Sequence, residues 1–179
     1  EGKGVLAHFG ASSARVIYMA TLGKAAGVFG AFVAAEKVVI ETLIQRARSY
    51  VYTTATPPLL AHALLQSLNL IKAERWRGER LCELIRALKT RLKLSRWRLA
   101  DSPTPIQPLI IGQSAEAVQV SAALAEQGIL VPAIRPPTVP EGTARLRISL
   151  SAAHRVEDVD RLIQVLRDVE QALVRGLHG

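Results

Sequence analysis

Apolar residues in the first third of the sequence gather in two short, nearly continuous runs. Residues 15–20 (RVIYMA) and 27–35 (GVFGAFVAA) are each typical of a strand that is buried on both faces. A polar, glycine-bearing turn over 21–27 joins these runs. From residue 36 to residue 48 the apolar positions recur at helical spacing, which predicts an amphipathic helix.

The middle of the sequence has a helical pattern. Pro57 and Pro58 interrupt the preceding helix and suit a turn or the first turn of a new helix, where a missing N–H costs little. We expect that helix over residues 59–72. A second helix is predicted over 74–93, because leucine and isoleucine side chains share one face there: Leu81, Leu84, Ile85, Leu88 and Leu92.

After residue 105 the pattern changes to strand–helix–strand–strand–helix. Strands are expected over 106–111, 129–134 and 144–150, and helices over 114–127 and 156–174. Gly128 is expected to end the first of these helices in a left-handed conformation. This order predicts a compact α/β unit with helices on one side of a small sheet. A domain boundary is expected between residues 60 and 75, which divides the chain into 1–70 and 71–179.

The composition narrows the class of protein. The 179 residues include 23 Lys+Arg and 15 Asp+Glu, a formal charge of +8, and 49% are hydrophobic, so the chain is not a disordered or collagen-like polymer. Charged residues interrupt the apolar stretches well before the ~20 residues needed to cross a bilayer, and we expect no signal peptide and no membrane partner. The single cysteine, Cys82, favours a reducing compartment, the cytoplasm.

The basic excess does not predict a nucleic-acid partner. The densest basic stretch, 89–98, contains one aromatic residue, and aromatic residues are only 4% of the chain. Surfaces that bind single-stranded nucleic acid combine several aromatic side chains with positive charge. The basic residues before Leu94 have helical spacing, and we therefore expect a solvent-facing helix surface there. No metal site is expected, because the histidines are scattered along the chain: His8, His62, His154 and His178.

The turn between the first two strands contains the most informative residue, Lys24. A lysine between two buried strands is costly unless it is exposed or functional. An amine in a partly desolvated pocket has a lowered pKa and can form a Schiff base with a carbonyl group. The Thr21 hydroxyl, three residues earlier, is a donor of the kind that a cofactor phosphate needs. On spacing alone, an ordinary surface lysine is the more common case.

The segment 21–27, TLGKAAG, resembles the cofactor-lysine segment of the α-oxoamine synthases, which are pyridoxal-phosphate enzymes of fold-type I. The resemblance continues through five further segments: 1–10 (EGKGVLAHFG), 52–58 (YTTATPP), 106–110 (IQPLI), 134–140 (IRPPTVP) and 142–149 (GTARLRIS). It implies an α/β fold, with the end of the large fold-type I domain followed by a small α/β carboxy-terminal domain. It also implies an acyltransferase that condenses an amino acid with an acyl thioester and releases carbon dioxide.

The resemblance assigns four residues to the cofactor, pyridoxal 5'-phosphate. Lys24 matches the lysine that binds the cofactor as a Schiff base and later moves the Cα proton of the amino acid. Thr21 matches a phosphate ligand. Thr54, with Thr53 beside it, matches a hydroxyl that reaches the phosphate of the partner subunit. The resemblance therefore implies a homodimer whose active site lies at the subunit interface.

Three further residues are assigned to the substrates. Arg147 matches the arginine that binds the amino-acid carboxylate, for which a planar guanidinium is well suited. Thr138 matches a substrate-contacting position, and Arg135 is expected close to it. By position alone, each of these residues also has an ordinary structural explanation. Arg147 could face solvent, Arg135 could be a turn residue, and Thr138 could be a loop residue. Thr53 and Thr54 could cap the helix that follows.

Within the family, the choice of substrates depends on the segment around Arg135. Arg135-Pro136-Pro137 is similar to the member that joins alanine to a pimeloyl thioester, whereas glycine-using relatives have an aromatic residue just before the proline. Two alternatives stay open. One is a glycine-using acyltransferase, and the other is a non-catalytic dimerisation module with a vestigial lysine turn.

One element of the family's site is missing from the sequence. Pyridoxal phosphate withdraws electrons effectively only when a carboxylate keeps its pyridine nitrogen protonated. Residues 1–23 contain no aspartate, and Glu1 is their only acid. In the family, that aspartate and the histidine that stacks on the ring precede the segment seen here. The chain therefore resembles the carboxy-terminal portion of the enzyme, and we expect that it does not bind the cofactor productively by itself.

Overall fold

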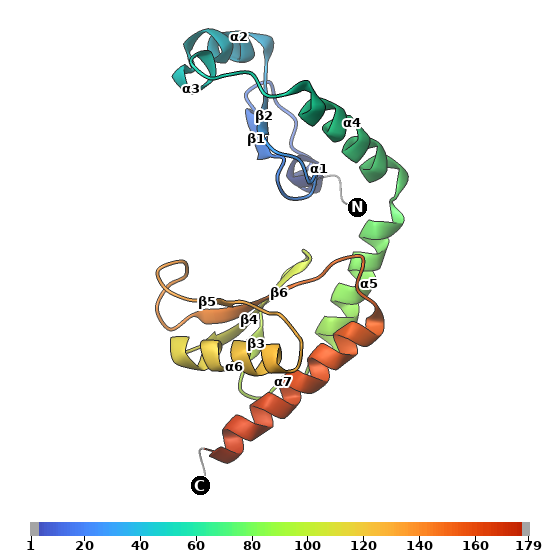
Figure 1. Ribbon diagram of the computed structural model, residues 1–179, viewed down its shortest axis with the longest axis vertical. Helices are drawn as coiled ribbons and strands as arrows, with labels where there is room; N and C mark the ends of the chain where they lie inside the picture. The colour runs from blue at the N-terminus through green and yellow to red at the C-terminus, as the bar shows by residue number, and fades with distance from the viewer. Residues whose placement is uncertain (1–3, 177–179) are drawn as a thin grey trace. The chain divides into compact units, whose positions relative to one another are not determined.

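The computed structural model describes residues 4–176 of the chain. His178 and the first three residues of the 1–10 segment lie outside the described residues. The chain divides into two units, Glu1–Arg75 and Trp76–Gly179 (Figure 1). No helix within residues 4–176 is both long and apolar enough to cross a membrane.

The first unit contains a two-stranded antiparallel sheet and several helices. Its elements are α1 (Gly4–Phe9), β1 (Tyr18–Thr21), β2 (Ala31–Ala34), α2 (Lys37–Arg46), α3 (Arg48–Val51) and α4 (Pro58–Ala73). The strands pair from Tyr18 opposite Ala34 to Thr21 opposite Ala31. The helices predicted over 36–48 and 59–72 are confirmed, and Pro58 lies in the first turn of α4. The short helix α1 was not predicted, because its six residues are too few for a periodic pattern.

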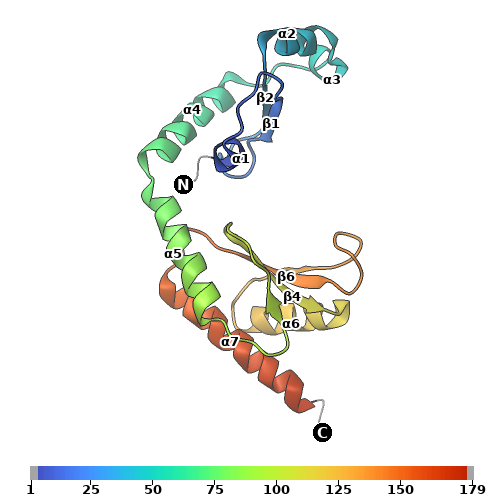
Figure 2. The same ribbon diagram turned by 180° about the vertical axis from the view of Figure 1, so that it is seen from behind.

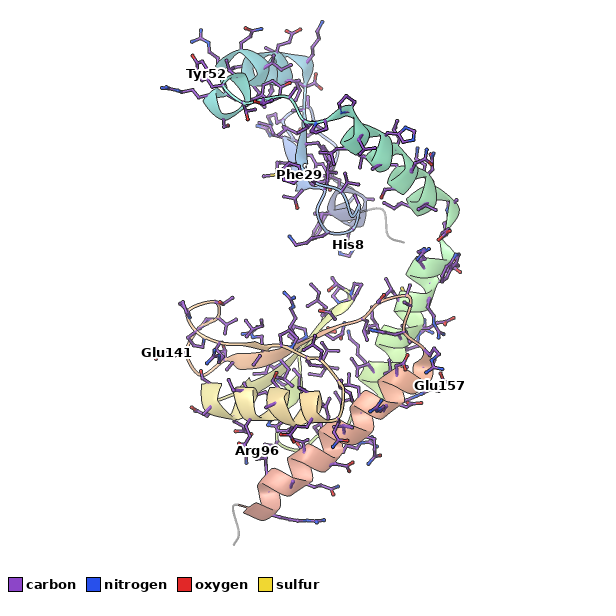
Figure 3. The ribbon with its side chains drawn as sticks, viewed as in Figure 1. His8, Phe29, Tyr52, Arg96, Glu141 and Glu157 are labelled. Atoms are coloured by element: carbon purple, nitrogen blue, oxygen red, sulfur yellow. The ribbon has the colours of Figure 1, made fainter. Side chains whose placement is uncertain are left out.

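The expectation that the first two strands are buried on both faces is wrong. Half-buried and exposed residues alternate along β1, and all four residues of β2 are exposed. Apolar side chains of this unit, such as Phe29 (73% exposed) and Tyr52 (80% exposed), face solvent (Figure 3). The physical reason is that a continuous apolar run indicates a need for burial, whereas the described residues of this unit place no second layer over the sheet.

The second unit contains an antiparallel sheet with the strand order β3-β4-β6-β5. Its elements are α5 (Trp76–Arg91), β3 (Arg98–Leu99), β4 (Ile106–Gly112), α6 (Ser114–Glu126), β5 (Ala133–Ile134), β6 (Ala144–Ser149) and α7 (Val156–Gly176). Helices α6 and α7 lie on the same side of the sheet (Figures 1 and 2). The predicted α/β fold and the strand–helix–strand–strand–helix order are confirmed, but the strand expected over 129–134 is only the two-residue β5. Gly128 has a φ of +74°, as expected for the residue that ends α6.

The core of this unit lies between one face of the sheet and the three helices. Along β6, Leu146 and Ile148 are buried, whereas Arg147 between them is exposed. This alternation directs one face of the sheet toward the helices and leaves the other without a helix of its own unit. The largest fully buried apolar side chains come from all three helices and both long strands: Leu84, Leu88, Leu109, Leu124, Leu146 and Leu166.

The basic stretch 89–98 is a helix surface only in its first part. Helix α5 ends at Arg91, and residues 98–99 form the short edge strand β3. Between them, the backbone N–H groups of Ser95 and Arg96 donate to the carboxylate of Glu170 on α7 at 3.2 and 2.7 Å. The helix predicted to reach residue 93 thus ends two residues earlier, at Arg91, and the carboxylate of Glu170 holds the loop that follows.

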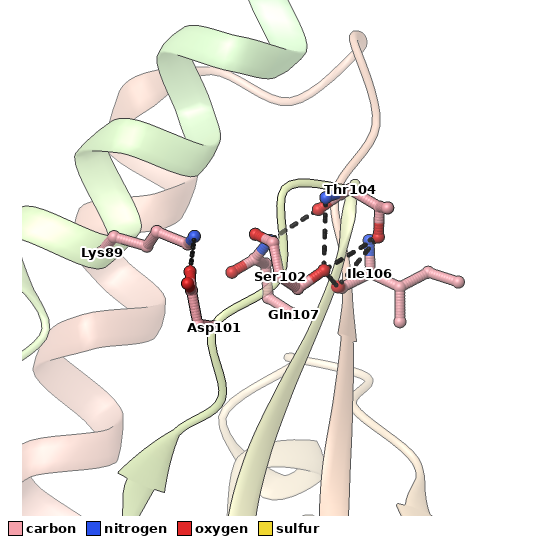
Figure 4. Close-up of polar contacts among 6 residues, drawn as sticks. All are labelled: Lys89, Asp101, Ser102, Thr104, Ile106 and Gln107. Carbon is pink, nitrogen blue, oxygen red and sulfur yellow. Dashed lines mark hydrogen bonds and ion pairs between the residues drawn. The ribbon is translucent and has the colours of Figure 1, made fainter. Parts of the chain in front are cut away.

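A polar network holds the loop that precedes β4. Gln107 is fully buried, and its Nε2 donates to the carbonyl oxygens of Ser102, at 2.9 Å, and Thr104 (Figure 4). The Ser102 hydroxyl donates to the carbonyl oxygen of Ile106 at 2.7 Å. Lys89 on α5 pairs with Asp101 at 2.7 Å. These bonds fix the entry of the chain into β4, the strand that pairs with Arg147.

Candidate functional site

Lys24 lies in the loop between β1 and β2, residues 22–30, which we call the lysine turn. The backbone N–H of Leu22 donates to Gly30 O at 2.8 Å, and Val28 N–H donates to Leu22 O at 2.9 Å. Inside this ring, Gly27 N–H donates to Lys24 O at 2.9 Å. Gly27 has a φ of +64°, a conformation that glycine adopts without steric cost. The predicted turn is therefore a closed loop that presents Lys24 between two paired strands.

Helix α4 anchors the lysine turn from outside. The Ser67 hydroxyl donates to the carbonyl oxygen of Ala26 at 2.7 Å, and Ser67 is half-buried. This is a contact between residues that are 41 positions apart in the sequence. No local pattern marks Ser67, so the sequence alone did not reveal it.

The side chains of Lys24 and Thr21 are both exposed within the described chain. Neither side chain has a hydrogen-bond or ion-pair partner among residues 4–176. Within the first unit no second layer covers the lysine turn, so a pocket around Lys24 stays a prediction. An amine and a hydroxyl on one hairpin without internal partners are available to a carbonyl group and an anion from outside.

Thr53 and Thr54 lie in the connection between α3 and α4, and both are exposed. The backbone N–H of Thr53 donates to Tyr50 O at 3.4 Å. The alternative that these threonines cap α4 is wrong, because the N-cap residue is Pro57 and no side chain bonds to the helix end. The N-cap position is occupied by Pro57, whose side chain cannot accept a hydrogen bond from the helix, and α4 begins at Pro58.

Arg147 lies on β6 of the second unit and points to the face of the sheet opposite the core. It stands opposite Pro108 on β4, and its backbone N–H donates to Pro132 O at 2.9 Å. Its side chain is exposed and has no carboxylate partner among the described residues. The guanidinium is therefore held by the sheet at its base and is free at its tip to bind an anion.

Arg135 and Thr138 lie in the loop between β5 and β6, residues 135–143. The backbone N–H of Thr138 donates to Arg135 O at 3.0 Å, which closes a turn around the two prolines. Both side chains are exposed, and the Arg135 guanidinium has no carboxylate partner among residues 4–176. The predicted proximity of Arg135 to Thr138 thus holds at the level of the backbone turn.

Some arginines of the second unit are paired with carboxylates. Arg91 donates to Asp160 at 2.7 Å, and Arg96 donates through Nε to Glu116 at 2.7 Å. The hydrogen bond from Arg96, followed by that from Trp97, holds the pKa of Glu116 below its usual range despite partial burial. Arg135 and Arg147 differ from these structural arginines because the described chain gives their guanidinium groups no acid.

The cavity of about 440 Å³ in the second unit does not coincide with the predicted residues. It lies between residues 128–131, the end of β6 and the start of α7. Its two oppositely charged side chains already have partners in the protein: Arg161 donates to Gln127 O at 2.6 Å, and Asp158 accepts from Arg155 N–H at 2.7 Å. We therefore assign no ligand to this cavity. Residues 4–176 contain no group of three or more histidine, cysteine or acidic side chains that could hold a metal ion.

The predicted residues thus fall into two sets. Lys24, Thr21, Thr53 and Thr54 belong to the first unit, and Arg135, Thr138 and Arg147 belong to the second. The first set offers an amine and hydroxyl groups, and the second offers two unpaired guanidinium groups and a hydroxyl. These are the donors needed to hold an aldehyde, a phosphate and a carboxylate.

Comparison with known proteins identifies the family. The model of the aminotransferase class I and II family matches residues 3–166, and the chain belongs to this family. The resemblance first inferred from the motifs is therefore confirmed, as is the fold class.

Two similar curated proteins are 8-amino-7-oxononanoate synthases. An 8-amino-7-oxononanoate synthase of Nitrosospira multiformis is 63% identical over 171 residues, which cover 96% of this chain and 43% of the relative. An 8-amino-7-oxononanoate synthase of Nitrosomonas europaea is 62% identical over 174 residues, covering 96% of this chain and 45% of the relative. The chain thus spans less than half the length of these relatives.

Solved structures show the same architecture. A serine palmitoyltransferase from Sphingomonas wittichii superimposes with a TM-score of 0.79 and 26% identity, over 87% of this chain and 40% of that one. A structure of SPT with a PLP internal aldimine gives the same values. An 8-amino-7-oxononanoate synthase from Francisella tularensis superimposes with a TM-score of 0.75 and 27% identity, over 89% of this chain and 47% of that one.

Proposed function

We propose that the chain is part of a pyridoxal-phosphate-dependent acyltransferase that condenses L-alanine with a pimeloyl thioester to give 8-amino-7-oxononanoate and carbon dioxide, a reaction of biotin synthesis. The observation that carries this proposal is the position of Lys24, an unpartnered amine in a closed hairpin turn. Relatives that are 62–63% identical across nearly all of this chain support the choice of reaction. The single cysteine supports a reducing compartment, the cytoplasm.

The residues present fit two groups of pyridoxal phosphate, its carbonyl group and its phosphate. The unpartnered Lys24 amine suits the carbonyl group, and the Thr21 hydroxyl on the same hairpin suits the phosphate. When bound, the cofactor supplies a ring that stabilises negative charge on the amino acid's Cα. The carboxylate that keeps the ring nitrogen protonated is not among residues 4–23, so the 179 residues alone are proposed to lack productive cofactor binding.

The residues of this chain then have separate tasks. The Lys24 amine holds the carbonyl group and, once free, takes a proton from the Cα of alanine. The Arg147 guanidinium binds and orients the alanine carboxylate through two parallel N–H donors. Because Arg147 takes the alanine carboxylate in this proposal, we assign the acyl substrate to Thr138, the substrate-contacting position, and to Arg135 beside it. Thr54, with Thr53 beside it, reaches the phosphate of the partner subunit, so the proposed enzyme is a homodimer.

The test of this proposal is whether the cofactor attaches at Lys24. The protein is produced at its natural length, treated with pyridoxal phosphate and borohydride, and digested for mass spectrometry. We expect the reduced cofactor on Lys24 and its loss in Lys24→Ala. Lys37→Ala is the matched control, because Lys37 is an exposed lysine of the same unit that pairs with Glu41 at 3.5 Å on its own helix. Failure to trap the cofactor on Lys24 would support a dimerisation module instead.

A second measurement separates alanine from glycine. A methyl group changes substrate preference by about 1–3 kcal/mol, or roughly 10–200-fold. We expect kcat/KM with pimeloyl thioester to be at least tenfold higher for alanine than for glycine. The reverse preference would identify a glycine-using acyltransferase, which the segment Arg135-Pro136-Pro137 disfavours.

A further inference from the structure

Arg145 is a half-buried arginine of β6 whose guanidinium bonds to a loop instead of to an acid. Its Nε donates to the carbonyl oxygen of Thr143 at 3.0 Å, and its Nη2 donates to the hydroxyl of Thr143 at 3.1 Å. No carboxylate among residues 4–176 pairs with it. Because a partly buried charge is costly without good hydrogen bonds, the position of this side chain calls for an explanation.

The contact continues past Thr143 toward the substrate loop. The Thr143 hydroxyl donates in turn to the carbonyl oxygen of Pro140 at 2.7 Å, and the Thr143 backbone N–H donates to the same oxygen at 3.2 Å. Pro140 is two residues beyond Thr138. Arg145, Thr143 and Pro140 therefore form one chain of donors and acceptors that ends inside the loop 135–143.

The strand register places Arg145 at the other end of this loop as well. Arg145 stands opposite Ile134, the last residue of β5 and the neighbour of Arg135. Arg145 thus contacts both ends of the loop 135–143. Its backbone pairs with Ile134, just before the loop begins, and its side chain bonds to Thr143, where the loop ends. Two donors in the fixed geometry of a guanidinium make this connection, which an ammonium group does not reproduce.

We propose that Arg145 is a positioning residue that holds the loop 135–143, so that Arg135 and Thr138 stand ready for the acyl substrate. The identity of the substrate at this loop, an acyl thioester, rests on the proposed function. The positioning role is distinct from the role of Arg147, two residues further along the same strand face, whose guanidinium has no internal partner and binds the amino-acid carboxylate in the proposed reaction.

Steady-state kinetics of the natural-length enzyme test the proposal. We expect Arg145→Gln and Thr143→Val each to raise the KM for the acyl thioester roughly tenfold, with the KM for alanine within about twofold of the wild-type value. The double variant should be no worse than the worse single variant, since both break one connection. Thr143→Ser keeps the hydroxyl and should restore the wild-type KM. Independent, additive effects of the two substitutions would overturn the proposal.

Arg98→Gln is the matched control for charge. Arg98 stands opposite Ile110 on β4, which stands opposite Arg145, so both arginines are on the same face of the sheet. Removing this charge leaves the loop bonds intact, and we expect an unchanged KM for the thioester. An equal increase in Arg98→Gln and Arg145→Gln would show that the positive charge of the face matters, and would overturn the positioning role.

Hydrogen exchange gives a readout that does not depend on activity. The amides of Thr138 and Thr143 donate to Arg135 O and Pro140 O, and we expect both to exchange faster in Arg145→Gln than in the wild type and in Arg98→Gln. Unchanged exchange would overturn the positioning role even in an active enzyme. Faster exchange in a protein that lacks condensation activity would support the held loop while refuting the proposed function.

Discussion

The hydroxyl of Ser67 on helix α4 donates a 2.7 Å hydrogen bond to the carbonyl oxygen of Ala26, two residues beyond Lys24. The lysine turn is otherwise closed only by its own backbone bonds. This contact therefore connects the proposed nucleophile to the helix that follows Pro57, and it sets the position of the turn relative to the rest of its unit.

Ser67→Ala tests that connection. Loss of this hydrogen bond removes about 1 kcal/mol of the free energy that holds the turn in place. We therefore expect the reduced cofactor to be trapped on Lys24 severalfold more slowly, with the protein still folded. The measurement is the time course of borohydride trapping followed by mass spectrometry. Asn69→Ala, on an exposed position of the same helix, is the control. Equal trapping rates in the two variants would mean that Ser67 does not position Lys24.

Arg147→Lys tests the assignment of the carboxylate-binding residue. A lysine keeps the charge but lacks two parallel donors, so we expect the KM for alanine to rise roughly 10–100-fold and the KM for the thioester to stay near the wild-type value. Arg98→Lys, on the same face of the sheet, should leave both KM values unchanged. A larger effect on the thioester than on alanine would contradict the assignment.

Glu116→Gln is expected to lower the stability of the protein in a pH-dependent way. Glu116 accepts from Arg96 Nε at 2.7 Å and from Trp97 Nε1 at 2.9 Å. These contacts, the bond from Arg96 first, lower the pKa of Glu116 in the folded state. A lowered folded pKa adds stability above the unfolded value, about 4.3, and this stability is lost as the pH falls through the folded pKa.

The measurement for this variant is urea unfolding followed by tryptophan fluorescence between pH 3 and pH 8. The wild type should be more stable than Glu116→Gln at pH 7, and the difference should shrink below about pH 4. Glu126→Gln, an exposed position of the same helix α6, should show no difference at any pH. A stability gap that stays constant with pH would show that the charge of Glu116 contributes nothing.

Gln107→Glu should also lose stability at neutral pH and regain part of it on acidification, because the substitution adds a buried carboxylate instead of removing a paired one. The Gln107 side chain is fully buried, and its Nε2 donates to two carbonyl oxygens. A carboxylate there is an uncompensated buried charge, which costs about 3–5 kcal/mol at pH 7. Because burial raises the pKa of the new carboxyl, acidification protonates it in the folded state first and restores part of the stability.

Urea unfolding at pH 7 and pH 5 checks this expectation. Gln119→Glu, on an exposed position of α6, is the control and should match the wild type at both values. A loss of stability in Gln107→Glu that does not change with pH would argue that the loss comes from the broken hydrogen bonds and not from the charge.

The sequence by itself determined the longer helices, the α/β order and the turn around Lys24. These features follow from the local chain, because side-chain spacing of 3.6 or 2 residues, a proline at a helix start and a glycine at a helix end act over a few residues. Helices α4, α5, α6 and α7 and the alternation along β6 were predictable for this reason. The motif segments added the family, which the comparison confirmed.

Only the tertiary structure decided which residues support the candidate site and which are buried. Ser67 meets Ala26 across 41 residues, and Glu170 meets Ser95 across 75, and no local pattern encodes such contacts. The same limit explains the exposed β2, since an apolar run indicates a preference for burial but not what covers it. Arg145 and Arg147 are the same residue type on the same face of β6. Only the tertiary structure shows that the Arg145 guanidinium bonds to Thr143, whereas the Arg147 guanidinium has no partner among the described residues.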